Sequence, residues 1–353
     1  MSTTSFSSRL KAKKTEIDSA IDRFFAESDT SMYSPHGQEA WDILMEFSSR
    51  PGKRIRGTLL LVAFEMYGGK RREEAMKAAV AIELIQNYLL IVDDVMDRST
   101  IRRTKPTVQY IYRDILESFK SNDARHIGDM LAVNVGLLAS HAAARLMNEI
   151  DVGADSLIAA NQKFHHNILQ TCFGQIDDLY LGVAKVDEGD VIRTHELKSS
   201  YYTFINPMQI GALLADADIE EVDLLREFGL PAGVAFQLQD DILGLFGTGS
   251  TGKSNTDDLK EGKVTLMIQY ALKHAKGTDL AIMKQALGNQ NVSDAQAQEV
   301  RRIVEECGAK DYATKQARKF ASDAGEVIDK SSWTDDYKAF LSELMQFITE
   351  RLS

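Results

Sequence analysis

The sequence has few of the residues that interrupt helices or form covalent and metal-bound frameworks. Only 5 of its 353 residues are proline and only 2 are cysteine. Cys172 and Cys307 lie far apart and lack the paired spacing of zinc ligands, so neither a zinc site nor a disulfide framework is indicated. Because a reducing cytosol suits such a composition, we expect a cytoplasmic protein.

Positive charge and long apolar runs are also scarce. The chain carries 41 Lys and Arg against 52 Asp and Glu, for a net charge of −11. This balance argues against a general nucleic-acid binder, because a phosphate backbone requires a basic face. No uninterrupted apolar run reaches the roughly 18 residues of a membrane span, and the N-terminus lacks the apolar core of a signal peptide. We therefore expect no transmembrane segment.

What the sequence does have is helical periodicity along most of its length. Apolar residues recur at three- and four-residue spacing, as in the segment 75–92, and strand alternation is hard to find. With 44% hydrophobic residues and no linker-like stretch, we expect one large all-α domain over residues 1–353. The predicted helices are separated by breaks at Pro35, Pro51-Gly52, Gly68-Gly69, Arg103–Pro106, Gly153, Asp187–Asp190 and Gly247–Asn255.

The first acidic motif is Asp93-Asp94-Val95-Met96-Asp97, at the predicted C-terminal end of an apolar helix. Asp93 and Asp97 are four residues apart, so they share a helix face and repel each other. A bound cation relieves this repulsion, and Mg²⁺ prefers one or two carboxylates with water and phosphate oxygens. An acidic, solvent-facing helix end is the alternative, because aspartate doublets recur elsewhere in this chain.

A second acidic pair, Asp240-Asp241, follows another apolar stretch. The position four after Asp240 is Gly244 rather than a third aspartate. A glycine-rich break follows, and around it the chain places the charged residues Lys253, Asp257, Asp258 and Lys263. Two such acidic helix ends could face each other across a cavity and hold a metal-bridged diphosphate between them.

Basic residues gather in two short segments of this acidic chain. The first is Gly52–Gly57, where a helix starting near Pro51 would place Lys53 and Arg56 on one face near its positive end. The second is the pair Arg102-Arg103, whose guanidinium groups can each bind phosphate oxygens in a forked geometry. Both segments are suited to binding phosphate.

In the order and spacing of these motifs, the chain resembles the trans-isoprenyl diphosphate synthases, the family of farnesyl and geranylgeranyl diphosphate synthases. The resemblance runs from residue 52 to Lys263 and also includes the elements Gly128–Leu131, Gly174–Asp178, Lys198-Ser199 and Phe236-Gln237. It implies an isoprenoid synthase-type helical bundle around a deep central cavity. The chain departs from the family pattern at Gly57, Thr104, Ser199 and Gly244.

The resemblance also implies a role for each matching residue. Three Mg²⁺ ions, for which Mn²⁺ could substitute, would be held on the allylic diphosphate by Asp93, Asp97 and Asp240. The same diphosphate would contact Arg102, Lys198 and Lys253. Isopentenyl diphosphate would be bound by Lys53, Arg56, Arg103 and Gln86. The remaining polar residues of the substrate site would be Asp178, Ser199, Gln237, Asp241 and Lys263.

The implied activity is a magnesium-assisted prenyl transfer by ionisation, condensation and elimination, in which isopentenyl diphosphate joins an allylic diphosphate head to tail. Tyr88 and Leu89 lie five and four residues before Asp93. An aromatic residue followed by a smaller one resembles the geranylgeranyl-forming enzymes, so a C20 product is expected. Farnesyl or longer products are the alternatives.

Two other functions are less compatible with these motifs. A terpene cyclase would lack the basic segment at residue 52 and would carry a different second metal motif. A non-catalytic subunit of a heteromeric synthase would have lost some of the acidic or basic groups, whereas all of them are present here. The resemblance further implies a homodimer. The C-terminal Arg351 could close over isopentenyl diphosphate, but a cation capping a helix is the simpler interpretation.

Overall fold

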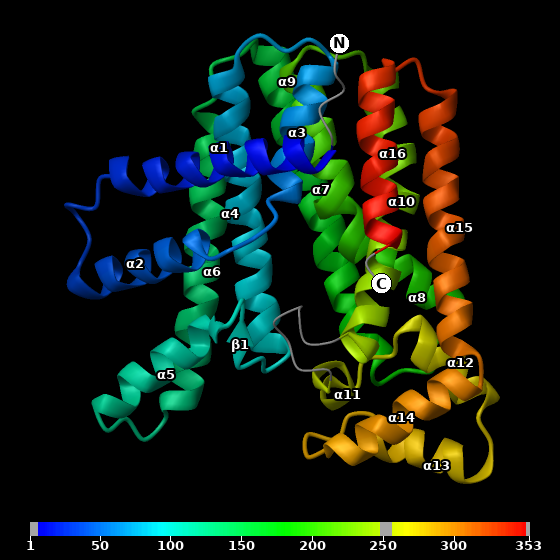
Figure 1. Ribbon diagram of the computed structural model, residues 1–353. Helices are drawn as coiled ribbons and strands as arrows, with labels where there is room; N and C mark the ends of the chain where they lie inside the picture. The colour runs from blue at the N-terminus through cyan, green and yellow to red at the C-terminus, as the bar shows by residue number, and fades with distance from the viewer. Residues whose placement is uncertain (1–5, 248–255, 351–353) are drawn as a thin grey trace. The chain divides into compact units, whose positions relative to one another are not determined.

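The computed structural model describes residues 6–247 and 256–350, and in this part of the chain nearly every element is a helix (Figure 1). The chain folds as two compact units, Met1–Asn161 with Ile210–Ala217, and Gln162–Gln209 with Asp218–Ser353. The elements are α1 Phe6–Glu27, α2 Pro35–Ser49, α3 Ile55–Met66, α4 Arg72–Met96, β1 Ile101–Arg102, β2 Lys105–Pro106, α5 Val108–Ser118, α6 Ala124–Asn148, α7 Ala154–Leu181, α8 Glu188–His195, the π-helix η1 Glu196–Ile205, α9 Asn206–Leu214, α10 Ile219–Phe246, α11 Asp257–Glu261, α12 Leu266–His274, α13 Gly277–Ala286, α14 Asp294–Glu306, α15 Ala309–Lys330 and α16 Asp335–Thr349.

In the first unit, the long helices α4 and α6 lie side by side, and α1 and α2 run across them (Figure 1). Close packing of α4 on α6 depends on small residues, since a Cβ at Gly136 would come within 3.0 Å of the Val92 side chain. Helix α1 buries a single stripe, Ile17, Ile21 and Phe25, at the four-residue spacing of an amphipathic helix. The unit is thus a helical layer crossed by a hairpin of two helices.

In the second unit, α10 is the central helix, and it packs against η1, α15 and α16 (Figure 1). Two glycines allow η1 to approach its neighbours. A Cβ at Gly174 of α7 would lie 2.2 Å from the Lys198 backbone nitrogen, and one at Gly233 of α10 would lie 2.3 Å from the Ser200 side chain. Because no larger residue fits at these positions, glycine fixes how closely η1 packs between the two helices.

The all-α fold expected from the periodicity is confirmed. The break predicted at Arg103–Pro106 is a tight hairpin, in which Ile101 pairs with Pro106 and Arg102 with Lys105. Two local expectations were wrong. The helix expected to start near Pro51 begins at Ile55, which leaves Lys53 outside it, and α10 continues five residues beyond Asp241 instead of ending at the acidic pair.

Two helices, α4 and α6, are long and apolar enough to cross a membrane by length and composition. They pack against each other, however, and 61% of the most apolar window of α4 is buried within the protein. Burial of this kind is typical of a core helix, and the length of the two helices is therefore weak support for a membrane span.

Candidate active site

The first acidic motif lies where the sequence placed it, at the C-terminal end of α4. Asp93 is half-buried, Asp97 is the C-cap residue, and Asp94 between them is completely buried. The buried Gln109 side chain donates hydrogen bonds of 2.8 Å to the carbonyl oxygens of Asp94 and Ser99, which fixes the chain as it leaves the helix. The carbonyl groups at a helix C-terminus carry partial negative charge, so cations are favoured beside these carboxylates.

Arg102 binds directly to this acidic motif. Its Nε and Nη2 donate to Asp94 Oδ1 at 2.9 and 2.5 Å, and Nη2 lies 3.7 Å from Asp93 Oδ2. Burial alone would lower the pKa of Arg102, but Asp94, Asp93 and Asp97 outweigh that effect and hold the pKa above its ordinary value. Arg102 is therefore permanently charged and held at the edge of the acidic motif, where a phosphate group could approach both.

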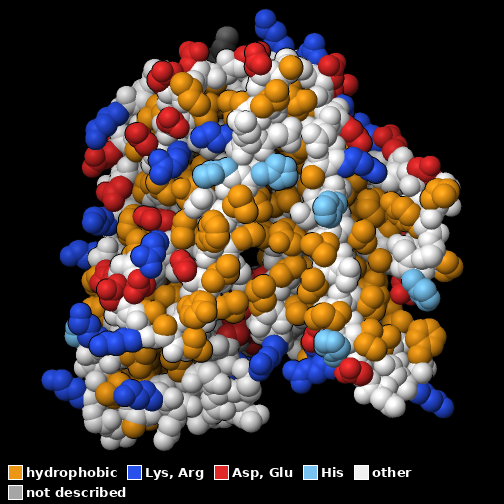
Figure 2. Space-filling view, turned by 180° about the vertical axis from the view of Figure 1, so that it is seen from behind, with side chains coloured by type: hydrophobic (Ala, Val, Ile, Leu, Met, Phe, Trp, Pro, Cys, Tyr) orange, Lys and Arg blue, Asp and Glu red, His pale blue; other side chains and the backbone are white. Residues whose placement is uncertain are grey.

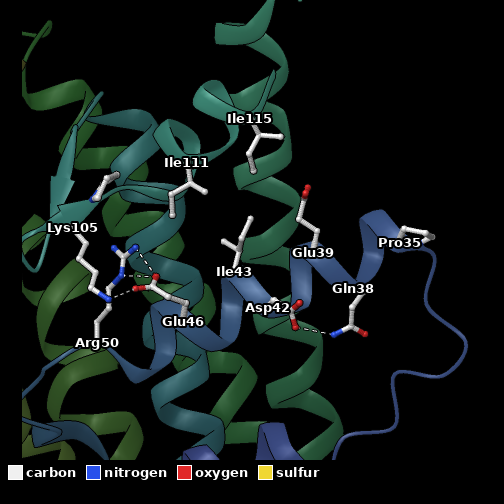
Figure 3. Close-up of a pocket in the computed structure, with 11 residues that line it drawn as sticks. Pro35, Gln38, Glu39, Asp42, Ile43, Glu46, Arg50, Lys105, Ile111 and Ile115 are labelled. Atoms are coloured by element: carbon white, nitrogen blue, oxygen red, sulfur yellow. Dashed lines mark hydrogen bonds and ion pairs between the residues drawn. The ribbon is translucent and has the colours of Figure 1, made fainter. Parts of the chain in front are cut away.

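The hairpin that carries Arg102 and Arg103 is tied to α2 by a network of ion pairs (Figure 3). The buried Arg50 donates through Nη1 to the carbonyl oxygen of Arg102 at 3.3 Å and through Nη2 to Glu46 at 2.7 Å. Lys105 donates to the other oxygen of Glu46 at 2.6 Å. These side chains close one end of a groove of about 500 Å³ between α2 and α5, which contains none of the predicted site residues.

The basic segment before α3 has a different structure from the one expected. Lys53 is exposed and precedes the helix, Arg56 is buried in its first turn, and Gln86 is half-buried on α4. Arg103 packs against this segment, with its guanidinium 3.3 Å from the Cβ position of Gly52 and Nη1 donating to Arg50 O at 3.4 Å.

Cations accumulate around Arg103. Its burial and the nearby Arg54, Arg102 and Arg56 together lower the pKa of Arg103 to about 10, which Glu83 only partly opposes. Burial is the largest cause of this lowering and the neighbouring positive charges add to it, so an anion bound beside Arg103 would stabilise its charged form. Arg54 and Arg102 are paired with carboxylates, so the positive charge available to an anion in this part of the first unit comes mainly from Arg103 and Arg56.

In the second unit, η1 presents two of the predicted residues to neighbouring helices. Lys198 Nζ donates to Asp178 Oδ2 of α7 at 2.6 Å, and Ser199 Oγ donates to Gln237 Oε1 of α10 at 2.5 Å. A π-helix is rare and occurs frequently at functional sites. The Gly174–Asp178 element contributes both the close approach at Gly174 and the carboxylate that Lys198 binds.

Gln237 continues this network to Asp241, a carboxylate that is 3% exposed. Asp241 Oδ1 accepts from Gln237 Nε2 at 2.8 Å, and the two oxygens lie 3.6 Å from Lys263 Nζ and 3.2 Å from His195 Nε2. Burial alone would raise the pKa of Asp241, but Lys263, His195 and Gln237 outweigh it and hold the pKa well below its usual range. Asp241 is therefore an ionised group, and it contacts Gln237, Lys263 and His195.

Asp240 is half-buried on α10, and one turn further along the helix Gly244 stands where the family pattern has an aspartate. A Cβ at Gly244 would lie 2.4 Å from Asp258 Oδ2, so the carboxylate of Asp258 on α11 occupies the space that a longer side chain would need. A side chain at position 244 would therefore require Asp258 to move. The predicted diphosphate ligand Lys253, like Arg351, lies outside the described residues.

The two residues predicted to set product length, Tyr88 and Leu89, are half-buried on α4. The Tyr88 ring lies beside α6, with Cδ2 3.4 Å from the Cβ position of Gly136. Tyr88 therefore fills space that a small residue on the neighbouring helix leaves open.

The donor groups suit Mg²⁺ better than a metal that needs a complete protein cage. Within the described ranges, no group of three or more His, Cys, Asp or Glu is assembled at metal-binding distance. Mg²⁺ needs only one or two carboxylates, because it keeps waters and takes phosphate oxygens from its substrate. Asp93 and Asp97 offer two carboxylates on one helix face, whereas Asp94 is already bound to Arg102.

The sequence predictions missed several residues that hold the site together. Asp94, Gln109, Arg50 and His195 were given no role, although each is buried. Asp94, Arg50 and His195 contact a predicted residue or its backbone, and Gln109 bonds to the Asp94 carbonyl. Two of the partners are distant in sequence, since Arg50 is 52 positions from Arg102 and His195 is 46 positions from Asp241. Periodicity shows only that such residues are on an inward face, so it could not pair them.

Comparison with known proteins identifies the class. The family model described as polyprenyl synthetase matches residues 38–306. The geranylfarnesyl diphosphate synthase of Aeropyrum pernix is 31% identical over 85% of this chain and 91% of its own length. The geranylgeranyl diphosphate synthase of Sulfolobus acidocaldarius is 30% identical, covering 85% and 87%. The chain therefore belongs to the polyprenyl synthetase family and is a prenyltransferase.

The fold leads to the same class. The crystal structure of geranylgeranyl pyrophosphate synthase from Corynebacterium glutamicum, complexed with isoprenyl diphosphate and magnesium, superposes with a TM-score of 0.90. It is 25% identical and the match covers 96% of this chain and 98% of that one. The helical isoprenyl diphosphate synthase fold is confirmed.

Proposed function

We propose that this enzyme condenses isopentenyl diphosphate with allylic diphosphates, with Mg²⁺ as the cofactor, and releases geranylgeranyl diphosphate. In each cycle the carbon–oxygen bond of the allylic diphosphate breaks, a carbon–carbon bond forms, and isopentenyl diphosphate loses a proton. The observation that carries the proposal is the pairing of two carboxylates, Asp93 and Asp97, with a fixed and charged arginine, Arg102, at one helix end.

In this proposal Asp93 and Asp97 hold two Mg²⁺ ions and Asp240 holds a third. When bound, Mg²⁺ neutralises the charge that develops on the departing diphosphate. Arg102 donates hydrogen bonds to the same phosphate oxygens, as its fixed position beside Asp93 favours. In the second unit Lys198 would donate to phosphate as well, and its 2.6 Å bond to Asp178 holds the ammonium in place until then.

Isopentenyl diphosphate would bind at the positive site formed by Lys53, Arg56 and Arg103, with Gln86 nearby. The lowered pKa of Arg103 supports this assignment, since a bound diphosphate would relieve the repulsion among the arginines. Chain growth would stop where Tyr88 blocks the product, which is the basis for expecting a C20 chain. A longer product is the second candidate, because one of the similar relatives is a geranylfarnesyl diphosphate synthase.

We further propose a homodimer in the cytoplasm. The α7 helix carries a stripe of exposed apolar side chains at alternating spacings of four and three residues, namely Leu169, Phe173, Ile176 and Tyr180. Figure 2 shows apolar side chains gathered over the middle of the face it displays. Large exposed apolar patches mark protein interfaces, and a stripe with this spacing suits packing against a second copy of the same helix.

The test is to incubate the purified protein with Mg²⁺, isopentenyl diphosphate and, in separate reactions, the C5, C10 and C15 allylic diphosphates, and to size the products by chromatography. We expect a C20 product from at least one starter. Absence of any condensation product with all three would overturn the proposal. Products of C15 or C25 would retain the activity and reject only the chain length.

A further inference from the structure

The start of α3, which carries Arg56, is not capped by its own residues. The N-cap residue is Arg54, and its side chain makes no capping hydrogen bond. A helix leaves its first backbone N–H groups without partners, and these are usually satisfied by a Ser, Thr, Asp or Asn at the N-cap. The end of α3 therefore needs an acceptor from elsewhere in the fold.

Glu83 of α4 is that acceptor. Its Oε1 accepts a hydrogen bond of 3.0 Å from the backbone N–H of Gly57, the third residue of α3, which is the bond an N-cap side chain would normally receive. Its Oε2 lies 3.3 Å from Arg54 Nη1. Glu83 is 1% exposed, so both oxygens are occupied by protein groups and neither can touch a substrate.

Arg54 is the second part of the same arrangement. It adopts the left-handed conformation, with φ of 52° and ψ of 36°, which is uncommon for a residue other than glycine, asparagine or aspartate. Its guanidinium is held at three points, because Nε donates to Asp18 Oδ1 at 2.7 Å and Nη2 to Ser48 O at 2.7 Å, in addition to the contact with Glu83. This turn of the backbone buries Arg54 and leaves the preceding Lys53 exposed.

Gly57 supplies the N–H that Glu83 binds, and a proline at this position would remove it. Proline has no N–H, so it could not donate to Glu83. A Cβ at Gly57 would also lie 2.9 Å from the Ile17 side chain of α1. Glycine at position 57 therefore allows the Glu83 carboxylate to cap the helix.

We propose that Glu83 is a positioning residue for isopentenyl diphosphate: by capping α3 and holding Arg54, it sets the positions of Lys53 and Arg56 without contacting substrate. This inference rests on the proposed function. Without Glu83, the first turn of α3 loses its acceptor and the left-handed turn at Arg54 loses one of its contacts. Arg56 and Lys53 then lose their fixed geometry, while the acidic end of α4, ten residues further along, keeps its own bonds to Arg102.

The experiment measures kcat and the KM for each substrate in Glu83→Gln, which keeps the size of the side chain and removes its charge. We expect the KM for isopentenyl diphosphate to rise roughly tenfold, with kcat and the KM for the allylic substrate within about threefold of the wild type. The matched control is Glu65→Gln. Glu65 also bonds to two cations, the buried Lys13 and the exposed Arg72, but it lies near the other end of α3, and its variant should leave all three constants unchanged.

A second pair of variants isolates the hydrogen bond and decides the question if Glu83→Gln does not fold. Gly57→Pro removes the N–H, and Gly57→Ala retains it while adding a methyl group against the flexible tip of Ile17. We expect the KM for isopentenyl diphosphate to be several-fold higher in Gly57→Pro than in Gly57→Ala. Equal constants in this pair, or equal increases of both KM values in Glu83→Gln, would reject the positioning role. A wild-type enzyme without turnover would instead reject the proposed function.

Discussion

The buried carboxylate Asp241 offers the most demanding test of the electrostatic organisation in the second unit. Asp241→Asn keeps the shape of the side chain and removes its charge. In the wild type this charge lies 3.2 Å from His195 Nε2 and 3.6 Å from Lys263 Nζ, and Asp241 is 3% exposed. The variant therefore leaves the largely buried Lys263 ammonium and the buried His195 ring beside a neutral amide.

The expected cost follows from the burial. Breaking a buried ion pair by removing one partner destabilises a protein by about 3–5 kcal/mol, because the remaining charge is left uncompensated. For a folding unit of this size, each kcal/mol lowers the thermal midpoint by roughly 2–4 °C. We expect the midpoint of Asp241→Asn to fall by about 10 °C at pH 7.

The pH dependence has a definite sign. The pKa of Asp241 is lower in the folded protein than in the unfolded chain, so its stabilising effect is complete above the unfolded value of about 4. The effect is lost as the pH falls through the folded pKa. The difference in stability between wild type and Asp241→Asn should therefore shrink as the pH falls below 4.

Thermal and urea unfolding, followed by circular dichroism at several pH values, measures this difference. The matched control is Asp279→Asn in the same unit, where an exposed carboxylate lies 3.0 Å from Arg302. Exposed ion pairs contribute about 0–1 kcal/mol, so the control should lower the midpoint by no more than about 3 °C. If Asp241→Asn unfolds at the same temperature as Asp279→Asn, the reasoning about the buried network is wrong.

Three further predictions concern the proposed reaction and the packing that supports it. Asp93→Ala should lower kcat at least roughly 100-fold while leaving the thermal midpoint within about 3 °C, and a variant that retains activity would count against a metal-binding role. Chelation with EDTA should abolish turnover, and excess Mg²⁺ or Mn²⁺ should restore it; full activity in EDTA would contradict magnesium dependence. Gly174→Ala should cost at least about 1–3 kcal/mol in urea unfolding, because the new Cβ would lie 2.2 Å from the Lys198 nitrogen, and unchanged stability would show that η1 can move away.

The helical fold could be predicted because periodicity and breaks are local signals. The aspartates at the end of α4 and the break at Arg103–Pro106 follow from an apolar run and its interruption, although the hairpin formed there was not predicted. The start of α3 could not be predicted in the same way. Proline at position 51 suggested an early start, whereas the helix begins where Arg54 adopts a left-handed turn held by Asp18 and Glu83, neither of which is near it in sequence.

The sequence by itself determined which residues have the chemistry for diphosphate and metal binding, because side-chain type and spacing on a helix depend only on neighbouring residues. Only the tertiary structure decided which of these side chains are held in place and which residues hold them. Arg102 could have been a solvated surface arginine, but folding places it against Asp94, and Asp241 acquires His195 and Lys263 from separate helices and loops. A buried charge requires a partner, and the fold rather than the spacing supplies one.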